Sequence, residues 1–433
     1  MGPASRRVAA CLLARLRSDE AGFGLIEVIV SSLLLVLVAS GVYLGLDAAS
    51  ATSGVNKHRS IATAIAQQDQ DRMRAMAVGE LSNYRDTLTS VVGPVTYTVR
   101  SSASWVTDDT GTASCTSGQA RAHYLRIASS VTWPGMHVDP VTVESIVAPP
   151  AGSFGTNLGS LAVQVRDRDG NGVPGVSVAL SGARSYVDVT NELGCVLWGY
   201  LPVGNYDVTL AKDGYVDKDA VATPRRQAGV VGEATSTVAF DYDLGGYVQA
   251  DFETRVDGIP TPARWHEFTL LSAHLTVPLS FDDDTGPQTS VRSDGRVYPF
   301  ADPYGVYAGS CVGADPRTYR QDPQLVLVER GGTRHAAVLL PPVDLQVVSG
   351  GRPVAGAVAR LTATGAGCGG TTTRTTGADG YLTERGLPYG TYAVCVQSGA
   401  RRLTGRVDNV LPTGVPVAAA TYDMTSAPTG TCP

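Results

Sequence analysis

Hydrophobic and polar positions divide the chain into an apolar N-terminal stretch, a shorter helical segment and a long alternating body. The 24 residues from 23 to 46 contain a single charged side chain, that of Glu27. At a rise of about 1.5 Å per residue, such a helix is about 36 Å long, which is enough to cross a bilayer. The pattern therefore predicts a transmembrane helix over 23–46.

The segment that follows keeps the helical spacing of apolar residues but is otherwise polar. Ile61, Ile65, Met73 and Met76 recur among polar side chains, as in an amphipathic helix. We expect one long helix over 23–81, whose second half packs its apolar side on the next domain. A generic juxtamembrane helix would show the same pattern, whereas the heptads are too few to support a coiled coil.

After the helix the pattern changes to alternation with β-branched residues, which is typical of strands. Candidate strands cover 95–100, 122–133 and 139–149. They predict a small β-rich head over 82–150. A stretch rich in proline, glycine and serine then predicts a linker over 151–160.

The body contains an internal repeat, in which residues of one copy recur in the other at the same spacing. A threonine is followed by a glycine, then by a leucine that opens the motif Leu-Pro-x-Gly-x-Tyr. The matching pairs are Thr190 and Thr376, Gly194 and Gly380, and Leu201 and Leu387.

Each copy has the pattern of a small antiparallel sandwich. Alternating apolar residues bury one face of each strand, and a glycine suits a tight turn that needs positive φ. A proline then bends the chain before a tyrosine whose ring can cover the sandwich edge. These residues are Val163, Val165, Val176, Val178 and Leu180 in the strands, Gly194 and Gly380 in the turns, and Pro202, Pro388, Tyr206 and Tyr392 at the bends.

The repeat resembles the carboxypeptidase regulatory-like family over residues 158–222 and 341–410. The resemblance implies transthyretin-like β-sandwich domains that act as structural spacers and not as peptidases. Neither copy has the early-strand lysine that isopeptide-forming adhesin relatives need, so we expect no such cross-link. We predict sandwiches over 161–245, 246–340 and 341–425 and a tail over 426–433, the middle domain having no recognised signature.

A charged residue within the apolar stretch needs a reason, because an ionised carboxylate in hydrocarbon costs a few kcal/mol unless it is paired. Glu27 follows Gly22 and Phe23 behind a short hydrophilic leader. This combination resembles the signal of type IV prepilins and pseudopilins. An ordinary secretory signal, cut near residues 38–40, and an uncut signal anchor are the alternatives.

The prepilin resemblance implies a cytoplasmic leader over 1–22 and a role for each residue of the motif. Prepilin peptidase would cut after Gly22, and the new amine of Phe23 would be methylated. Glu27 would then pair with the Phe23 amine of a neighbouring subunit during assembly.

Composition and charge narrow the functional classes. The chain is 17% charged and 43% hydrophobic, as folded proteins are, and its formal net charge of −6 argues against a nucleic-acid-binding body. Arginines precede the apolar stretch, so the positive-inside tendency keeps that end cytoplasmic. We expect a single-pass protein of the cytoplasmic membrane with an extracytoplasmic C-terminal body.

Six of the seven cysteines follow the apolar stretch, which in an exported β-rich body suggests disulfides. Their pairing cannot be derived from sequence. We expect at least one bond among Cys368, Cys395 and Cys432.

Two acidic loops and the histidines are the remaining candidates for chemistry. The loop over 167–172 resembles the first half of a calcium loop but lacks the final acid, where Val178 stands. The acids of 281–286 are better explained by an exposed loop. The six histidines form no metal or catalytic motif, and His266 beside Glu267 is typical of a strand. We expect no enzyme activity, metal or cofactor.

These observations predict an α+β protein with a long N-terminal pilin-type helix, a small β head and tandem immunoglobulin-like or transthyretin-like sandwiches. The favoured function is a minor pilin or pseudopilin that joins a cell-surface filament, with prepilin peptidase, other pilin subunits and the membrane as partners. The alternative is a stationary adhesin or receptor for an extracellular glycan or protein. The sequence does not distinguish a motility pilus from a DNA-uptake pseudopilus or a secretion system. It also does not give the position of the subunit at the tip or in the shaft, or the ligand of the β domains.

Overall fold

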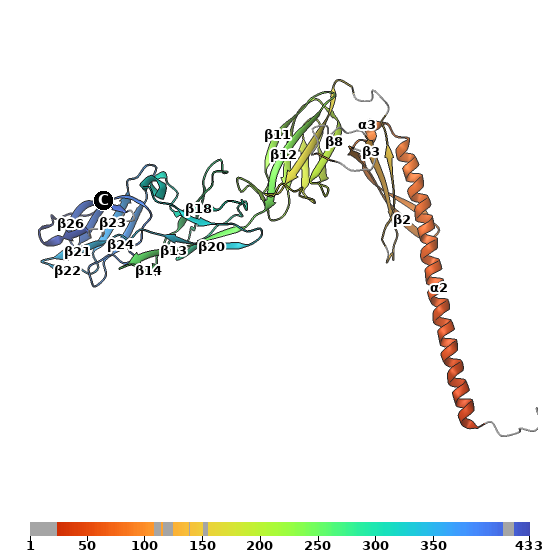
Figure 1. Ribbon diagram of the computed structural model, residues 1–433, viewed down its shortest axis with the longest axis horizontal. Coiled ribbons are helices and arrows are strands. Elements are labelled where there is room, and N and C mark those ends of the chain that lie inside the picture. The colour runs from red at the N-terminus through yellow and green to blue at the C-terminus, as the bar shows by residue number, and fades with distance from the viewer. Residues whose placement is uncertain (1–23, 108–113, 116–123, 138, 150–154, 410–419) are drawn as a thin grey trace, which may run out of the picture. The chain divides into compact units, whose positions relative to one another are not determined.

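The computed structural model describes residues 24–107, 114–115, 124–137, 139–149, 155–409 and 420–433. A 50-residue helix, α2 (Leu25–Arg74), is followed by the short helix α3 (Val78–Leu81) and then by strands (Figure 1). Short 3₁₀ helices interrupt the strands at Val312–Ala314 and Pro316–Tyr319 and follow the last strand at Met424–Ser426. The expected α+β class is confirmed. Two compact units are found and are described separately: one holds α2 and most of the first four strands, and the other holds the remaining β-rich sequence.

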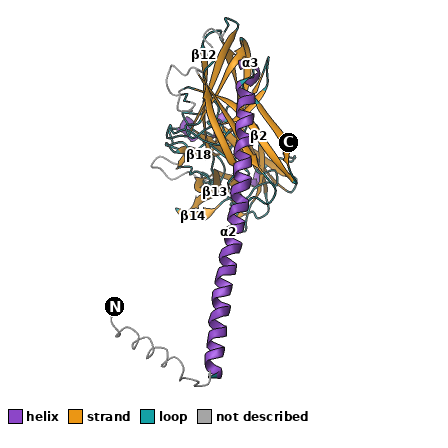
Figure 2. Cartoon of the chain, turned by 90° about the vertical axis from the view of Figure 1, so that its right-hand side faces the viewer, coloured by secondary structure: helices purple, strands orange, loops and turns teal. Residues whose placement is uncertain are grey.

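Four strands form the sheet of the first unit in sequential order. They are β1 (Arg85–Val92), β2 (Val95–Val106), β3 (Tyr124–Thr132) and β4 (Val141–Val147). Alternate residues of β2 are buried, among them Tyr97 and Val99, because one face of the sheet packs against the C-terminal half of α2. Figure 2 shows β2 beside this half of the helix.

The expected apolar side of the helix packs on this core: Ile61 and Ile65 are partly buried against it, and Met73 is fully buried. The sequence pattern did not single out Ala62 and Ala66, which are fully buried at the centre of the contact. Alanine allows the helix axis to approach the sheet closely, and the larger side chains then close the edges of the contact.

The second unit begins with a sandwich of two four-stranded sheets around its own hydrophobic core. One sheet has the order β10-β12-β5-β8 and the other β11-β9-β6-β7. The strands are β5 (Leu158–Arg166), β6 (Ser177–Ser181), β7 (Tyr186–Val189), β8 (Cys195–Pro202), β9 (Gly204–Ala211), β10 (Tyr215–Asp217), β11 (Arg225–Val230) and β12 (Thr235–Leu244).

The middle of the body contains two further sheets. One has the order β14-β13-β17 with β20 also paired to β13, and the other has the order β16-β15-β18-β19. Their strands are β13 (Tyr247–Val256), β14 (Ile259–Pro262), β15 (Glu267–Leu271), β16 (Leu279–Asp282), β17 (Ser290–Arg292), β18 (Tyr304–Ala308), β19 (Gln324–Val326) and β20 (Thr333–Leu339).

The last sandwich pairs a three-stranded sheet, β22-β21-β27, with the four-stranded sheet β24-β23-β25-β26. One continuous core of buried side chains runs through this sandwich and the middle sheets. The strands are β21 (Leu345–Ser349), β22 (Arg352–Pro353), β23 (Val358–Ala363), β24 (Thr371–Thr375), β25 (Gly390–Ser398), β26 (Arg401–Asn409) and β27 (Ala420–Asp423).

The two sequence repeats form the same local structure. The Thr190 hydroxyl donates to the carbonyl of Val173 at 2.7 Å and accepts from the amide of Val176 at 2.9 Å. Thr376 does the same with Val354 and Ala357, at 2.6 and 3.0 Å. Each threonine thus satisfies one backbone carbonyl and one buried backbone amide.

The turn glycines and the tyrosines also have the same conformation and contacts in the two repeats. Gly194 and Gly380 have φ of 68° and 71°, the positive values that the sequence predicts. The hydroxyls of Tyr206 and Tyr392 each donate to a proline carbonyl four residues earlier at 3.0 Å. Both rings lie inside the sandwich, where they pack as core side chains.

Replacing either repeat threonine by valine tests whether the two copies depend on the same contact. T190V or T376V removes the partner of a backbone carbonyl and of a buried amide, so each should lower the free energy of unfolding of its own sandwich by about 2 kcal/mol. Hydrogen exchange read by mass spectrometry would locate the loss at β6 or at β23. The exposed Thr237 and Thr373, replaced by valine, are the controls, and equal protection in test and control variants would contradict the assignment.

Candidate assembly site

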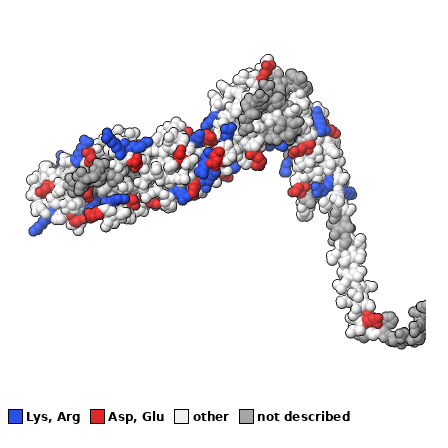
Figure 3. All heavy atoms as spheres, viewed as in Figure 1, with Lys and Arg blue, Asp and Glu red and all other residues white. Residues whose placement is uncertain are grey.

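The N-terminal half of α2 is apolar and exposed. Residues Ile26–Leu44 form a helix long and apolar enough to span a membrane, and the space-filling view shows almost no charge along this part of the chain (Figure 3). The large side chains here are about half to three-quarters exposed. A surface of this kind has to be covered by lipid or by protein. The apolar helix and the disulfides together indicate an exported protein.

Glu27 is the acidic residue in the first turn of α2. Its side chain is exposed, and its amide donates to the carbonyl of Gly24 at 2.8 Å. No ion pair of Glu27 occurs within the described part of the chain. Gly22 and Phe23, the predicted processing residues, lie outside the described residues, so the relation of Glu27 to them stays a prediction.

The other half of α2 is fixed to the sheet by a buried carboxylate. Asp69 is 6% exposed. One of its oxygens accepts from the guanidinium of Arg72 at 2.7 Å, and the other accepts from the hydroxyls of Ser101 at 2.7 Å and Ser129 at 2.6 Å. The two serines lie on β2 and β3, so a single helix residue is bonded to two strands.

Gln70 extends this network to the strand on the other side. Its amide nitrogen donates to the carbonyls of Ile127 and Val143 at 3.3 and 2.9 Å, and its carbonyl accepts from the Ser145 hydroxyl at 2.6 Å. Gln70 is 2% exposed. Asp69 and Gln70 together therefore connect α2 to β2, β3 and β4.

An aromatic contact marks the other end of the interface. The Nδ1 atom of His58 lies 2.8 Å from the Tyr97 hydroxyl, and its ring stacks on Trp133 with the centroids 5.9 Å apart. Burial raises the pKa of Tyr97, so the phenol is neutral and can serve as a hydrogen-bond donor. The contact between α2 and the sheet thus runs from His58 to Arg72, which donates to the hydroxyl of Ser101, and the apolar half of the helix extends beyond it.

Sequence patterns alone did not identify Asp69 and Gln70. Together with Ala62, Ala66 and Met73 they recur at helical spacing, and all five are buried. A polar residue in such a row is usually interpreted as solvent-facing. Their position around the helix could have identified them, because both lie on the helix face that the buried alanines define.

The six cysteines beyond the helix form three disulfides. Cys395 bonds to Cys432, which is a bond among the three cysteines from which we expected at least one. Cys368 bonds instead to Cys311 of the middle sheets. Cys115 bonds to Cys195 at the start of β8. Two of these bonds join segments that belong to neighbouring parts of the second unit.

The calcium-like loop is used for an ion pair. The guanidinium of Arg330 lies 3.2 Å from Asp167, 2.8 Å from Asp169 and 2.8 Å from Asp243. Its hydrogen bonds to Asp243 raise the pKa of the guanidinium above its ordinary value. Arg330 thus connects the loop before β6 to the segment before β20, and the acids that resembled ligands have a protein partner.

The second acidic loop is organised by its own residues. One carboxylate oxygen of Asp283 accepts from the amide of Thr285 at 2.9 Å and from its hydroxyl at 2.5 Å, which lowers the pKa of Asp283. This arrangement is typical of a capped turn. Within the described residues no group of three or more histidine, cysteine or acidic side chains is placed to hold a metal ion.

Replacing Asp69 by alanine tests whether the network holds the helix on the sheet. D69A leaves two buried serine hydroxyls without their acceptor, so the first unit should lose about 3 kcal/mol of stability. D71A is the matched control, since Asp71 lies two residues away and its exposed pair with Arg74 should contribute less than about 1 kcal/mol. Hydrogen exchange of β2 and β3 in the detergent-solubilised chain measures the difference, and similar losses in both variants would refute the role.

No protein-family model matches the sequence. No curated protein matches it either. Among solved structures, the TIE protein of Bacillus anthracis aligns at 11% identity over 79% of this chain and 74% of its own, with a TM-score of 0.21. A minor pilin of Streptococcus agalactiae aligns at 13% identity over 42% and 94%, with a TM-score of 0.22.

A major pilin subunit of Bacillus cereus aligns at 10% identity over 62% of this chain and 100% of its own, with a TM-score of 0.18. The chain therefore shows a distant structural similarity to the TIE protein and to pilins of Gram-positive bacteria. TM-scores this low do not indicate a shared overall arrangement, so nothing about assembly or partners follows from them.

Proposed function

We propose that this chain is a minor pilin or pseudopilin, a subunit of a type IV pilus or pseudopilus that carries exported β-sandwich domains. Its N-terminal helix would anchor it in the cytoplasmic membrane until assembly and would enter the filament core afterwards. Prepilin peptidase and other pilin subunits would be its partners, and the mature protein would reach the cell surface within the filament.

The observation that carries this proposal is the division of α2 into two halves. The C-terminal half is bonded to a sheet through Asp69 and Gln70. The N-terminal half is continuous, apolar and exposed, with one acid in its first turn. A simple anchor would need no acid at this depth, whereas a helix that pairs with a neighbour's amine would.

The repeats fit the spacer role that we propose for carboxypeptidase regulatory-like domains. Both copies use their threonine, glycine and tyrosine for internal contacts. These internal contacts support a role for the repeats in extending the body. A stationary adhesin that uses α2 only as an anchor is the second candidate, because it would have the same exported domains.

Processing distinguishes a prepilin from an ordinary anchor. We expect the membrane-extracted protein to begin at an N-methylated Phe23 in cells with active prepilin peptidase. Mass spectrometry of the N-terminal peptide checks this, with cells that lack the peptidase as the control. A leader that stays intact in the presence of the active enzyme would contradict the proposal.

Glu27 should matter for assembly and not for membrane insertion. E27A removes one member of a buried charge pair at a cost of about 3 kcal/mol, which corresponds to about a 100-fold loss of filament incorporation. The measurement is the amount of protein in sheared filaments relative to the membrane fraction. The variant D71A, changed at an exposed acid of the same helix, is the control. Unimpaired incorporation of E27A would favour the stationary adhesin.

A further inference from the structure

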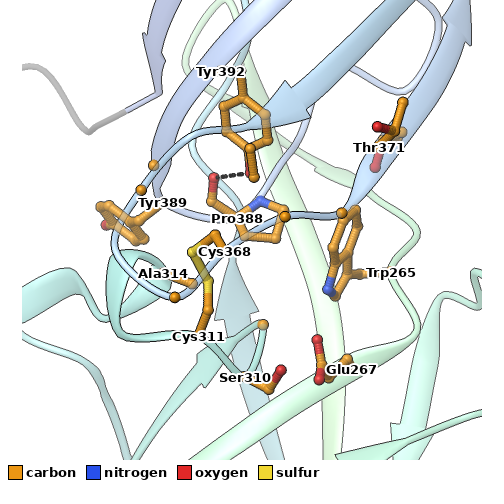
Figure 4. A pocket seen from close by; sticks show the side chains of 18 of the residues that line it. Trp265, Glu267, Ser310, Cys311, Ala314, Cys368, Thr371, Pro388, Tyr389 and Tyr392 are labelled. Atoms are coloured by element: carbon orange, nitrogen blue, oxygen red, sulfur yellow. Dashed lines mark hydrogen bonds between the residues drawn. A yellow bond between two sulfur atoms is a disulfide. The ribbon is translucent and has the colours of Figure 1, made fainter.

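A cavity of about 360 Å³ lies between the middle sheets and the last sandwich. The segment 265–267 and the loop after β18 form one side, and the glycine-rich loop before β24 and the start of β25 form the other (Figure 4). Its volume is in the range of small-molecule sites. Neither the repeat contacts nor the helix explains it.

Trp265 supplies the strongest indication of a ligand. The side chain is 9% exposed, and its indole N–H is buried without a hydrogen-bond partner. Reciprocal backbone bonds to Gln288, at 3.0 and 2.9 Å, hold the residue in place. A buried donor without an acceptor costs about 1–3 kcal/mol, and a ligand oxygen would remove that cost.

Glu267 supplies an acceptor on the same wall. It begins β15, and its backbone carbonyl accepts from the amide of Gly309 at 3.1 Å. Its carboxylate makes no hydrogen bond or ion pair with any described residue. Figure 4 shows the indole nitrogen of Trp265 and the carboxylate of Glu267 on the same side of the cavity.

The opposite wall is cross-linked and leaves space. The Cys311–Cys368 disulfide ties the glycine-rich loop to the middle sheets. A β-carbon added at Gly369 or at Gly370 would meet no atom within 4 Å. Tyr389 adds a second aromatic side chain, and burial raises its pKa to about 12, so its hydroxyl stays neutral.

A second cavity, of about 480 Å³, continues past the tryptophan. It shares Trp265, His266 and two threonines with the first and is also lined by Arg374 and the acidic loop 282–284. Arg374 is 9% exposed, and its Nε and one Nη atom have no partner. Each cavity is thus lined both by a residue with an unpartnered donor, Trp265 or Arg374, and by at least one carboxylate.

We propose that the two cavities form a binding site for a neutral oligosaccharide, with one sugar ring held between Trp265 and Glu267. The apolar face of a sugar ring packs on aromatic side chains, and its hydroxyls both accept and donate, as an unpartnered N–H and a carboxylate require. The lining of the first cavity contains one carboxylate and no lysine or arginine, which disfavours binding of an anionic ligand. The site is independent of filament assembly, so it goes beyond the proposed pilin role.

The test is binding of the full detergent-solubilised chain to an array of neutral, acidic and amino sugars, followed by calorimetry with the neutral sugars bound. We expect neutral oligosaccharides to bind, and trisaccharides to bind more tightly than their monosaccharides because they reach the second cavity. W265F keeps a ring but removes the donor, and E267Q weakens the acceptor. Each should reduce affinity on the order of tenfold.

E192Q, changed at an exposed acid of the first sandwich, is the control and should bind as the native chain does. Peptide mapping of the Cys311–Cys368 bond establishes that each variant is folded around the cavity. Absence of neutral glycan binding, a preference for acidic or amine ligands, or full affinity in both W265F and E267Q would overturn the proposal. E27A should bind glycan normally, so a failure of filament assembly leaves this result unaffected.

Discussion

The structure of the first unit depends on one buried carboxylate, that of Asp69. A charge removed from water is tolerated only when its hydrogen bonds are satisfied by fixed partners. Asp69 meets this condition with Arg72 on its own helix and with serines on two strands. These directional contacts set the register of helix on sheet, which the small alanine side chains of the interface could not do.

This polar attachment explains how one helix can serve two environments. If the C-terminal half were held only by large apolar side chains, it would resemble the N-terminal half and could exchange its protein contact for lipid. With Asp69 and Gln70 in the interface, entry of that half into an apolar environment would leave polar groups without partners. The two halves therefore differ in the polarity of their side chains and are not separated by a break in the helix, since α2 is continuous from Leu25 to Arg74.

Features whose physics is local could be predicted from sequence. The positive φ of Gly194 and Gly380 follows from a turn that only a few residues define, and the same holds for the long apolar helix. The pairing of Cys368 with Cys311 could not be predicted, because it depends on how the last sandwich meets the middle sheets. Ala62 was overlooked for a related reason: the residue closest to a neighbouring element is often the smallest, and hydrophobicity alone ranks it below Ile61.

The cavity at Trp265 could not be predicted from the sequence, because its walls come from segments far apart in the chain. In the sequence His266 and Glu267 are only neighbours in a strand, and the residues that share the cavity with them lie in two later stretches, 309–314 and 363–392. The continuous core and the Cys311–Cys368 bond keep those walls together without a ligand. A site that is already formed loses little conformational freedom on binding.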